Sequence, residues 1–429
     1  MYAAHSIHTL KRSRRLLQIS YLLMAFLFLG ATNGLARGYY TANGDTWHLT
    51  GTEDELLPYK LLSPSSQNST CSCTNGININ AIGGRTISSL VGDGTLTVAM
   101  LNNTCLSIEG TLIVDVDYII DGGEILMHPG ATIILPDQGN ADLMLTNINQ
   151  NGGIHGCGEQ MWRHIRVEAG CTLDMNNCQV EDAQYAIFAT HLSKILLTDN
   201  DFNRNFIGIY VAPDAVPQNI NRNIKGNTFR SEGADLLPTV DQFLAGLTYD
   251  VNLLNITYAG ILLHDVNGFT IGGSGNEKNT FRAVHRGIIA DNVLGLNIYD
   301  NDFIDINSQN LPFGSYAILV SQTDMEIVRA YFNNCYYGII AYSPSNGGTI
   351  IRNTIMEAVS YGIGINSIED NSINIRDNEI EARYTGISAF DSYPTGELII
   401  EDNMLTTYAD LSSYEGIVVG VGPYISEIP

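Results

Sequence analysis

Residues 298–303 read Ile-Tyr-Asp-Asn-Asp-Phe, and the pattern of this phrase returns through the second half of the chain. An aliphatic residue is followed by two variable positions, Asn, one variable position, and Phe or an aliphatic residue, about every 22 to 27 residues. The copies are Leu197-x-x-Asn200-x-Phe202, Ile224-x-x-Asn227-x-Phe229, Ile298-x-x-Asn301-x-Phe303, Ile350-x-x-Asn353-x-Ile355, Ile375-x-x-Asn378-x-Ile380 and Ile400-x-x-Asn403-x-Leu405. Because a repeat this short cannot bury its own apolar face, neighbouring copies must stack into a solenoid.

The residues within each repeat predict strands. Apolar residues alternate, as in Ile209-x-Val211, and Gly, Asn and Asp fill the gaps, which indicates strands of about three to six residues joined by tight turns. One repeat is long enough for three strands and three turns, and stacking places like strands in parallel about 4.8 Å apart. The sequence therefore predicts an all-β parallel solenoid of about a dozen turns, each of roughly 20 to 27 residues.

Stacking turns the repeat into columns of like residues. We expect an internal aliphatic column that includes Ile350, and a column of Phe rings that gives way to Ile355 and later aliphatic residues. Between them we expect an Asn column at a turn, where side-chain amides satisfy backbone groups and one another. Its expected members are Asn200, Asn227, Asn279, Asn301, Asn353, Asn378 and Asn403, with Cys178 in the same slot one turn earlier. We interpret this column as structural rather than catalytic.

The N-terminal residues do not share the repeat. Residues 1–36 combine a basic segment, an apolar run at about 16–29 and small residues at 34–36, which is typical of a cleaved signal peptide. An uncleaved signal anchor is the alternative, although the apolar run falls short of the about 20 residues that a span needs. We expect an exported protein with no membrane span in the mature chain, a non-repeat segment and linker at 37–76, and the solenoid at 77–429.

One interruption is large. Asn227 and Asn279 are separated by about twice the period. Either residues 231–258 leave the stack as a loop, or a degenerate turn from Tyr249 to Leu254 fills the gap, and the run Leu-Leu-Pro-Thr at 236–239 favours a loop. Insertions in solenoids tend to lie on one edge and often form the binding site.

The charge of the chain limits its partners. The 21 basic and 45 acidic residues give a net charge of −24, and removing residues 1–36 leaves 17 basic against 45 acidic, near −28. Contacts to nucleic-acid phosphates need a basic face, so no nucleic-acid partner is expected. The acidic composition is compatible with Ca²⁺, but the sequence contains no specific calcium motif. We therefore predict no cofactor and no metal site.

Seven cysteines are an odd number, so at least one lies outside an intrachain disulfide. Cys71-x-Cys73 is too short for a mutual bridge and, with no His close by in the sequence, is a weak metal motif. Cys171 and Cys178 are better disulfide candidates, with Cys105 or Cys157 as further partners, and the sequence does not assign the pairs.

With these motifs, the chain resembles the right-handed parallel β-helix proteins of the pectate-lyase-like superfamily over roughly residues 77–429. It is also similar to exported β-helix surface proteins of Bacteroidetes-type bacteria, which carry a segment like Gln-Met-Trp-Arg-His-Ile-Arg-Val-Glu at 160–168. The resemblance implies a fold that hosts lyases, hydrolases, epimerases, adhesins and phage tailspikes, so function must be argued from the site.

The resemblance implies two catalytic patterns. Polygalacturonase-like hydrolases of this fold carry Asn-Thr-Asp, Asp-Asp, Gly-His-Gly and Arg-Ile-Lys, and none of these strings occurs here. Pectate-lyase-like enzymes need a calcium cluster and an Arg or Lys base, for which the nearest candidates are Lys278, Arg282, His285 and Arg286. Such a patch could bind a uronate carboxylate and abstract a proton. The alternative is an outward column in which Lys278 pairs across turns with Asp300.

Aromatic residues form a further pattern, two or three positions before the isoleucine of each Gly-Ile pair or its equivalent. They are Tyr185, Phe206, Tyr258, His285, Tyr316, Tyr337, Tyr361, Tyr384 and Tyr414. If their ring faces are exposed, Tyr337, Tyr361 and Tyr384 form a platform for sugar rings, and if the rings lie inward or edge-on, they form a packing stack. The residues after the isoleucines should point outward toward a covering loop or a partner surface. These are Tyr210, Leu262, Ile289, Leu319, Ile340 and Val418.

We therefore expect an extracellular or cell-surface β-helix protein that is not an enzyme and contacts polysaccharides, cell-surface glycans or other surfaces through one face. The alternative is a polysaccharide lyase or glycoside hydrolase that acts on acidic polysaccharide through the Lys278–Arg286 region. The missing enzyme strings favour the first interpretation.

Overall fold

The structure is a computed structural model that describes residues 71–97, 100–137, 140–190, 192–212, 223–239, 256–307, 314–344, 348–366, 371–391, 397–407, 414–421 and 424–427. The chain divides into two compact units, and every described residue belongs to the one made of Gln67–Val240 and Leu254–Pro429. The expected signal peptide and nearly all of the segment at 37–76 lie outside the described residues. In the part of the chain that the structure describes, no helix is long and apolar enough to cross a membrane.

The described strands stack into three faces, which we name A, B and C. Face A contains β5 (Asp142–Thr146), β8 (Thr172–Asn176), β11 (Lys194–Thr198), β14 (Asn223–Lys225), β17 (Thr270–Gly272), β20 (Leu296–Tyr299), β23 (Met325–Val328), β26 (Thr349–Arg352), β28 (Ser372–Arg376) and β30 (Glu397–Glu401). Face B contains β6 (Ile154–Gly156), β9 (Gln179–Glu181), β12 (Asp201–Asn203), β15 (Thr228–Arg230), β18 (Thr280–Arg282), β21 (Asp302–Ile304), β24 (Tyr331–Asn333) and β31 (Met404–Thr406). Face C contains β4 (Thr132–Leu135), β7 (His164–Val167), β10 (Tyr185–Ala189), β13 (Ile207–Val211), β16 (Ala259–His264), β19 (Arg286–Asp291), β22 (Tyr316–Ser321), β25 (Tyr337–Tyr342) and β32 (Glu415–Val421).

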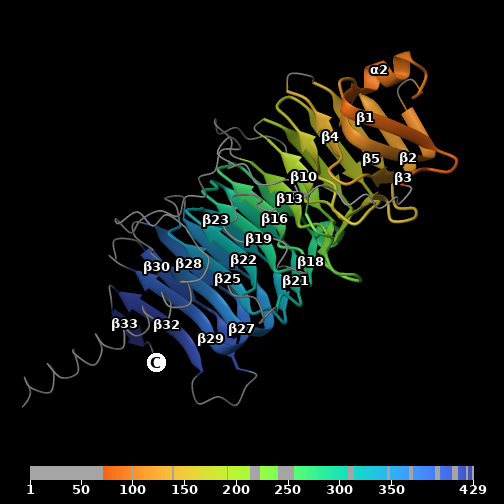
Figure 1. Cartoon of the computed structure of the whole chain (residues 1–429). Coiled ribbons are helices and arrows are strands. Elements are labelled where there is room, and N and C mark those ends of the chain that lie inside the picture. The colour runs from red at the N-terminus through yellow and green to blue at the C-terminus, as the bar shows by residue number, and fades with distance from the viewer. Residues whose placement is uncertain are drawn as a thin grey trace, which may run out of the picture. The chain divides into compact units, whose positions relative to one another are not determined.

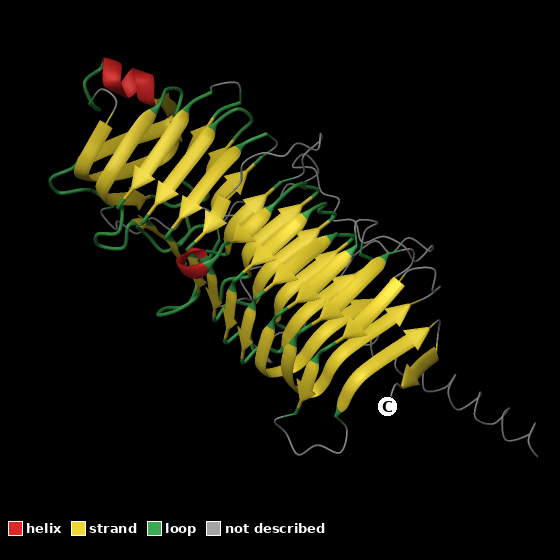
Figure 2. Cartoon of the chain, turned by 180° about the vertical axis from the view of Figure 1, so that it is seen from behind, coloured by secondary structure: helices red, strands yellow, loops and turns green. Residues whose placement is uncertain are grey.

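Five longer strands bend around a corner and belong to more than one face. They are β1 (Ile77–Thr86), β2 (Met100–Ile113), β3 (Tyr118–Met127), β27 (Ile355–Asn366) and β29 (Glu379–Asp391). The remaining described elements are the helix α2 (Ile87–Gly92), the 3₁₀ turn η3 (Gly275–Glu277) and β33 (Tyr424–Glu427). Figure 2 shows how little of the described chain is helical.

Each strand pairs in parallel with the strand one turn away in the same face, as β10, β13, β16, β19, β22 and β25 do in Figure 1. The exception is β33, which pairs antiparallel with β32. Three strands per turn and a stack close to a dozen turns confirm the predicted all-β parallel solenoid.

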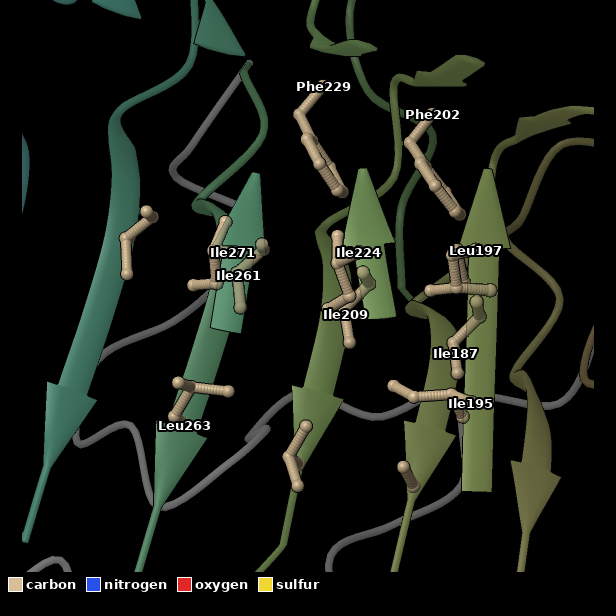
Figure 3. Packing of buried hydrophobic residues seen from close by; sticks show 14 of the residues in the cluster. Ile187, Ile195, Leu197, Phe202, Ile209, Ile224, Phe229, Ile261, Leu263 and Ile271 are labelled. Carbon is tan, nitrogen blue, oxygen red and sulfur yellow. The ribbon is translucent and has the colours of Figure 1, made fainter. Parts of the chain in front are cut away.

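The predicted columns fill the interior of the solenoid. Figure 3 shows aliphatic side chains such as Leu197, Ile224 and Ile271 in rows along the stack, beside the rings of Phe202 and Phe229. The Phe rings stack face to face with centroids 4.9 Å apart along the series Phe202, Phe229, Phe281, Phe303 and Phe332. These rings are fully or almost fully buried, so the column is part of the hydrophobic core.

The structure places most of the expected Asn residues in a hydrogen-bonded ladder of two stretches, separated by the turn in which Ala330 takes the slot. The Nδ2 atoms of Asn200, Asn227 and Asn279 donate to the Oδ1 atom of the Asn one turn ahead over 2.9–3.1 Å. Asn378 donates to Asn403 in the same way over 2.8 Å. The ladder amides also donate to backbone carbonyls of the preceding turn, as Asn301 does to Ile271. Cys178 occupies the ladder slot one turn before Asn200, and the backbone N–H of Cys178 donates to Asn200 Oδ1.

The copy that begins at Ile350 was assigned one residue too early. Ile351 pairs with Ile327 and is buried, whereas Ile350 is 38% exposed. Thr354, not Asn353, takes the ladder slot and donates through Oγ1 to Asn378 Oδ1 over 2.8 Å. The ring column continues through Met356 and not through Ile355, which is 42% exposed.

Asn353 occupies the left-handed backbone position that precedes the slot. Its φ of 54° matches that of Asp300, Asp377 and Asp402 at the same place in their turns. Asn and Asp tolerate this conformation better than most residues do, which explains why Asn is found at position 353. Because this Asn is next to the ladder slot, the sequence pattern placed the repeat one residue too early.

Residues 231–258 connect face B to face C. β15 pairs directly with β18, and Asn227 bonds directly to Asn279, so no additional turn lies between them. The alternative turn from Tyr249 to Leu254 lies outside the described residues. In the described part of the segment, the carbonyl of Pro238 accepts the N–H of Met161, which precedes the buried Trp162.

The disulfide in the described residues joins Cys73 to Cys105. The preference for Cys171 and Cys178 was therefore wrong. Both are reduced and buried, because they lie at inward positions of the solenoid. Their thiols donate to backbone carbonyls, Cys171 to Pro136 and Cys178 to Leu145.

Candidate functional site

The aromatic residues of face C separate into two columns. Strand pairing places Arg286, Tyr316, Tyr337 and Tyr361 at the same position on consecutive turns. Phe206, Tyr258 and His285 each lie one residue earlier and are buried. The outer column consists of residues exactly two positions before the isoleucine. The sequence pattern allowed two or three positions, and it therefore combined the outer and inner columns into one.

A stack of side chains, which we name the ring ladder, runs along this face through Arg286, Tyr316, Tyr337 and Tyr361. Tyr258 and Tyr384 each lie one residue earlier in register and pack against its two ends. Tyr337 lies between Tyr316 and Tyr361, with ring centroids 4.8 and 4.9 Å apart and planes 10° and 21° from parallel. Tyr384 continues the stack at 5.2 Å from Tyr361. Neighbouring rings therefore cover both faces of Tyr337 and one face of Tyr361, while Tyr384 leans against the other at 31°, so the ladder presents mainly ring edges and hydroxyl groups rather than an open platform.

Arg286 fills the one turn of the ladder that lacks a ring. Its guanidinium carbon lies 4.8 Å from the ring centroid of Tyr258 and 5.6 Å from that of Tyr316. One terminal nitrogen donates to the hydroxyl of Tyr258, while Nε is buried with no hydrogen-bond partner among the described residues. The guanidinium plane thus takes the place of a ring in the stack and makes cation–π contacts with the rings of Tyr258 and Tyr316.

The exposed part of the ladder is polar at its rim. Tyr316, Tyr337, Tyr361 and Tyr384 are half-buried. Burial is the main cause that raises the pKa of Tyr316, Tyr337 and Tyr361, so these phenols remain protonated at neutral pH. Each hydroxyl can therefore both donate and accept a hydrogen bond.

The apolar residues that follow the Gly-Ile isoleucines lie beside the ladder. Leu262, Ile289, Ile340 and Val418 are buried, and Tyr210 and Leu319 are half-buried. Toward the N-terminal end, Tyr210 packs with Tyr185 and Phe188, with ring centroids 5.6 and 5.0 Å away. The pattern could have revealed Phe188, because it lies directly after Ile187 and pairs with Tyr210.

The basic candidates are held by separate partners. Lys278 pairs with Asp302 rather than with Asp300, and Arg282 lies 3.0 Å from Glu232. Asp300 instead accepts two hydrogen bonds from Arg329 over 2.8 and 2.7 Å. Charges thus pair across turns as predicted, and the difference is that Lys278 takes Asp302 in place of Asp300.

His285 is separated from these cations by its position in the interior. It is buried, and its Nδ1 lies 3.2 Å from Ser315 Oγ. Burial, assisted by the charge of Arg286, lowers the pKa of His285 to about 3. The group is neutral at ordinary pH and is packed in the core, away from any open surface.

Residues 259–421 match a protein-family model described as the right handed beta helix region. No curated protein and no solved structure gives a significant match to the chain. The matched residues include the ring ladder from Arg286 to Tyr384. Together with the parallel stack of strands, the match identifies the solenoid as a right-handed parallel β-helix and supports the resemblance to the pectate-lyase-like superfamily.

Proposed function

We propose that this right-handed parallel β-helix is a non-catalytic protein of the cell exterior that holds an extended, neutral polysaccharide along the ring ladder of face C. The observation that carries the proposal is the regular repeat of the ladder. Ring centroids from Tyr316 to Tyr384 are separated by 4.8–5.2 Å, one ring per turn. An extended β-linked sugar chain advances by a similar length per sugar, so successive sugars would meet successive tyrosine edges.

The chemistry of the ladder suits sugar hydroxyls. Tyrosine hydroxyls at the rim can donate to and accept from them, and the half-buried Leu319 offers an apolar contact to sugar C–H groups. Each contact would contribute only about 1 kcal/mol. Affinity for a polymer would arise from several turns that act together.

Charge favours a neutral ligand over an acidic one. The chain has a net charge of −24, which repels a polyanion. Two guanidinium groups contact the ladder, and rings already engage both of them, Arg286 between Tyr258 and Tyr316 and Arg383 over Tyr384. A neutral glycan avoids this repulsion and can still bond to the hydroxyl rim.

The lyase or hydrolase alternative has less support. Lys278 and Arg282 are each paired with a carboxylate, and His285 is buried. A base that abstracts a proton must reach the substrate, which the buried His285 cannot do, and the two cations are already engaged by carboxylates.

The proposal is tested by affinity electrophoresis of the full chain in gels that contain soluble β-glucan, mannan or xylan, with polygalacturonate and alginate as acidic comparators. The decisive variant replaces Tyr316, Tyr337 and Tyr361 by Phe, which keeps the stack and removes the hydroxyls. Tyr331→Phe on face B is the matched control, since its hydroxyl bonds to Glu357 instead.

Retention in at least one neutral gel, weakened several-fold in the triple Phe variant and unchanged in Tyr331→Phe, supports the proposal. Replacing Tyr337, Tyr361 and Tyr384 by Ala should abolish retention. A lowered thermal midpoint of this triple Ala variant would show that the stack also stabilises the fold. In that case the triple Phe variant, which keeps the stack, tests the glycan contact. A wild-type chain that no neutral polysaccharide retards contradicts the proposal, as does equal retention of all variants.

A further inference from the structure

Three potential metal ligands meet in the first turns of the solenoid, far along the sequence from the ring ladder. Cys71 precedes β1, His128 follows β3, and Cys157 follows β6 on the next turn. Their candidate ligand atoms, the two Sγ atoms and a ring nitrogen of His128, all lie within 4.8 Å of one another. All three side chains are half-buried.

The backbone of each residue is held in place. Cys71 lies two residues from Cys73, which is joined by a disulfide to Cys105 on β2. The N–H of Cys157 donates to the carbonyl of Met127 over 3.0 Å, and the N–H of His128 donates to the carbonyl of Ile108 over 3.0 Å. His128 and Cys157 are therefore held at the ends of paired strands, and Cys71 is held by the nearby disulfide, so the backbone keeps the three side chains close together.

The imidazole also has the surroundings of a metal ligand. Its Nε2 lies 2.9 Å from the carbonyl oxygen of Cys71 and 3.1 Å from Ser107 Oγ. A carbonyl only accepts hydrogen bonds, so the neutral ring that satisfies it carries its proton on Nε2 and keeps a lone pair on Nδ1. Metal-binding histidines usually donate their second ring N–H to a carbonyl or carboxylate in this way.

We propose that Cys71, His128 and Cys157 bind one Zn²⁺ ion. Two sulfurs and one imidazole are ligands that Zn²⁺ prefers, and the fourth tetrahedral position would be taken by water. On binding, the two thiols release their protons to solvent, and two thiolates neutralise the charge of the ion. In this half-buried place a neutral metal–ligand set avoids the cost of burying a net charge.

Binding would tie together two turns of the solenoid and the segment that leads into β1. The Cys157 thiol donates to the Met127 carbonyl over 3.3 Å, which holds its sulfur beside the end of β3. The ion we propose thus cross-links parts of the chain, and it is independent of the proposed glycan contact.

The test uses the full chain with Cys73–Cys105 intact, freed of metal by a chelator. Co²⁺ is titrated as a spectroscopic stand-in and Zn²⁺ by calorimetry, and alkylation of each cysteine by N-ethylmaleimide is followed by mass spectrometry. Cys157→Ser and His128→Gln remove a ligand each, and Cys335→Ser is the matched control at a buried thiol that donates to the Phe303 carbonyl elsewhere in the solenoid.

We expect one ion per chain, a thiolate-to-cobalt charge-transfer band, and alkylation of Cys71 and Cys157 slowed at least about tenfold by Zn²⁺. Affinity should fall at least about tenfold in each ligand variant and stay unchanged in Cys335→Ser. No band and no protection would overturn the proposal, as would a disulfide between Cys71 and Cys157 in the purified chain. Unchanged affinity in Cys157→Ser would also overturn it.

Discussion

The side-chain amide of Asn279 donates a hydrogen bond to Oδ1 of Asn301, one turn further along the solenoid, over 2.9 Å. The same amide donates to the carbonyl of Ile224 on the preceding turn over 3.0 Å. Asn279 Oδ1 in turn accepts the backbone N–H of Asn227 over 2.9 Å. One fully buried side chain therefore satisfies groups on both neighbouring turns.

This geometry predicts that Asn279→Asp is strongly destabilising. The new carboxylate would place an oxygen against two acceptors, Ile224 O and Asn301 Oδ1, in a buried place. We expect the free energy of unfolding to fall by about 3 kcal/mol or more, measured by urea denaturation.

The matched control for that variant is Asn353→Asp, the same substitution at the residue just outside the ladder. Asn353 is exposed, and Asp occupies the equivalent left-handed position at Asp377 and Asp402. We expect a change within about 0.5 kcal/mol. Equal losses in the two variants would show that the ladder assignment is wrong.

The glycine of the Gly-Ile pair predicts a second contrast. A Cβ on Gly260 would lie 2.6 Å from Cδ1 of Phe281 and 2.8 Å from the carbonyl of Gly287, so the Phe column leaves no room for a side chain. On the last turn, the nearest atom to a Cβ on Gly416 is Leu405 Cδ1 at 3.9 Å. Gly260→Ala should lower stability by about 1–3 kcal/mol, and Gly416→Ala should leave the thermal midpoint nearly unchanged. The reverse order would contradict this packing.

Buried His285 predicts a pH dependence of stability. Its pKa is lowered to about 3 by burial, with a smaller effect of Arg286, whereas the unfolded chain has the ordinary value of 6.5. Between these values the unfolded state binds the extra proton, so this stabilising contribution is present above pH 6.5 and is lost as the pH falls toward 3.

The comparison that isolates His285 is the variant His285→Phe, which keeps an aromatic ring beside Tyr258. From pH 7.5 to pH 5, wild-type chain should lose about 2 kcal/mol more stability than the variant. His164, whose pKa is lowered in the same direction mainly by burial, remains in both proteins and cancels. Parallel stability curves of the two proteins would contradict the lowered pKa.

Most of the fold could be predicted because the repeat determines which residues face inward. The error at Ile350 shows the limit of such a pattern. Ile350 and Ile351 are adjacent aliphatic residues, and Asn353 resembles a ladder residue, so spacing alone allows two registers. The pairing of Ile351 with Ile327 decides between them, and pairing is a property of the stacked turns.

The candidate sites were harder to predict because they join distant residues. The sequence pattern selects His285 as the ring of its turn, but the residue that pairs with Tyr316 is Arg286. Successive residues of a strand point to opposite sides, so an error of one residue exchanges a buried side chain for an outward one. Likewise His128 approaches Cys71 across 57 positions of sequence. The sequence around Cys71 and Cys73 therefore does not predict that contact.

The most direct test of the proposed glycan contact is a hydroxyl-radical footprint of the full chain, with and without the neutral polysaccharide that retards it most. The account predicts that oxidation of Tyr316, Tyr337 and Tyr361 on face C falls several-fold in the presence of the polymer. Oxidation of Tyr299 on face A and Tyr331 on face B, which are also half-buried, should be unchanged. Unchanged oxidation of the three ladder tyrosines, or equal protection of Tyr299 and Tyr331, would contradict it.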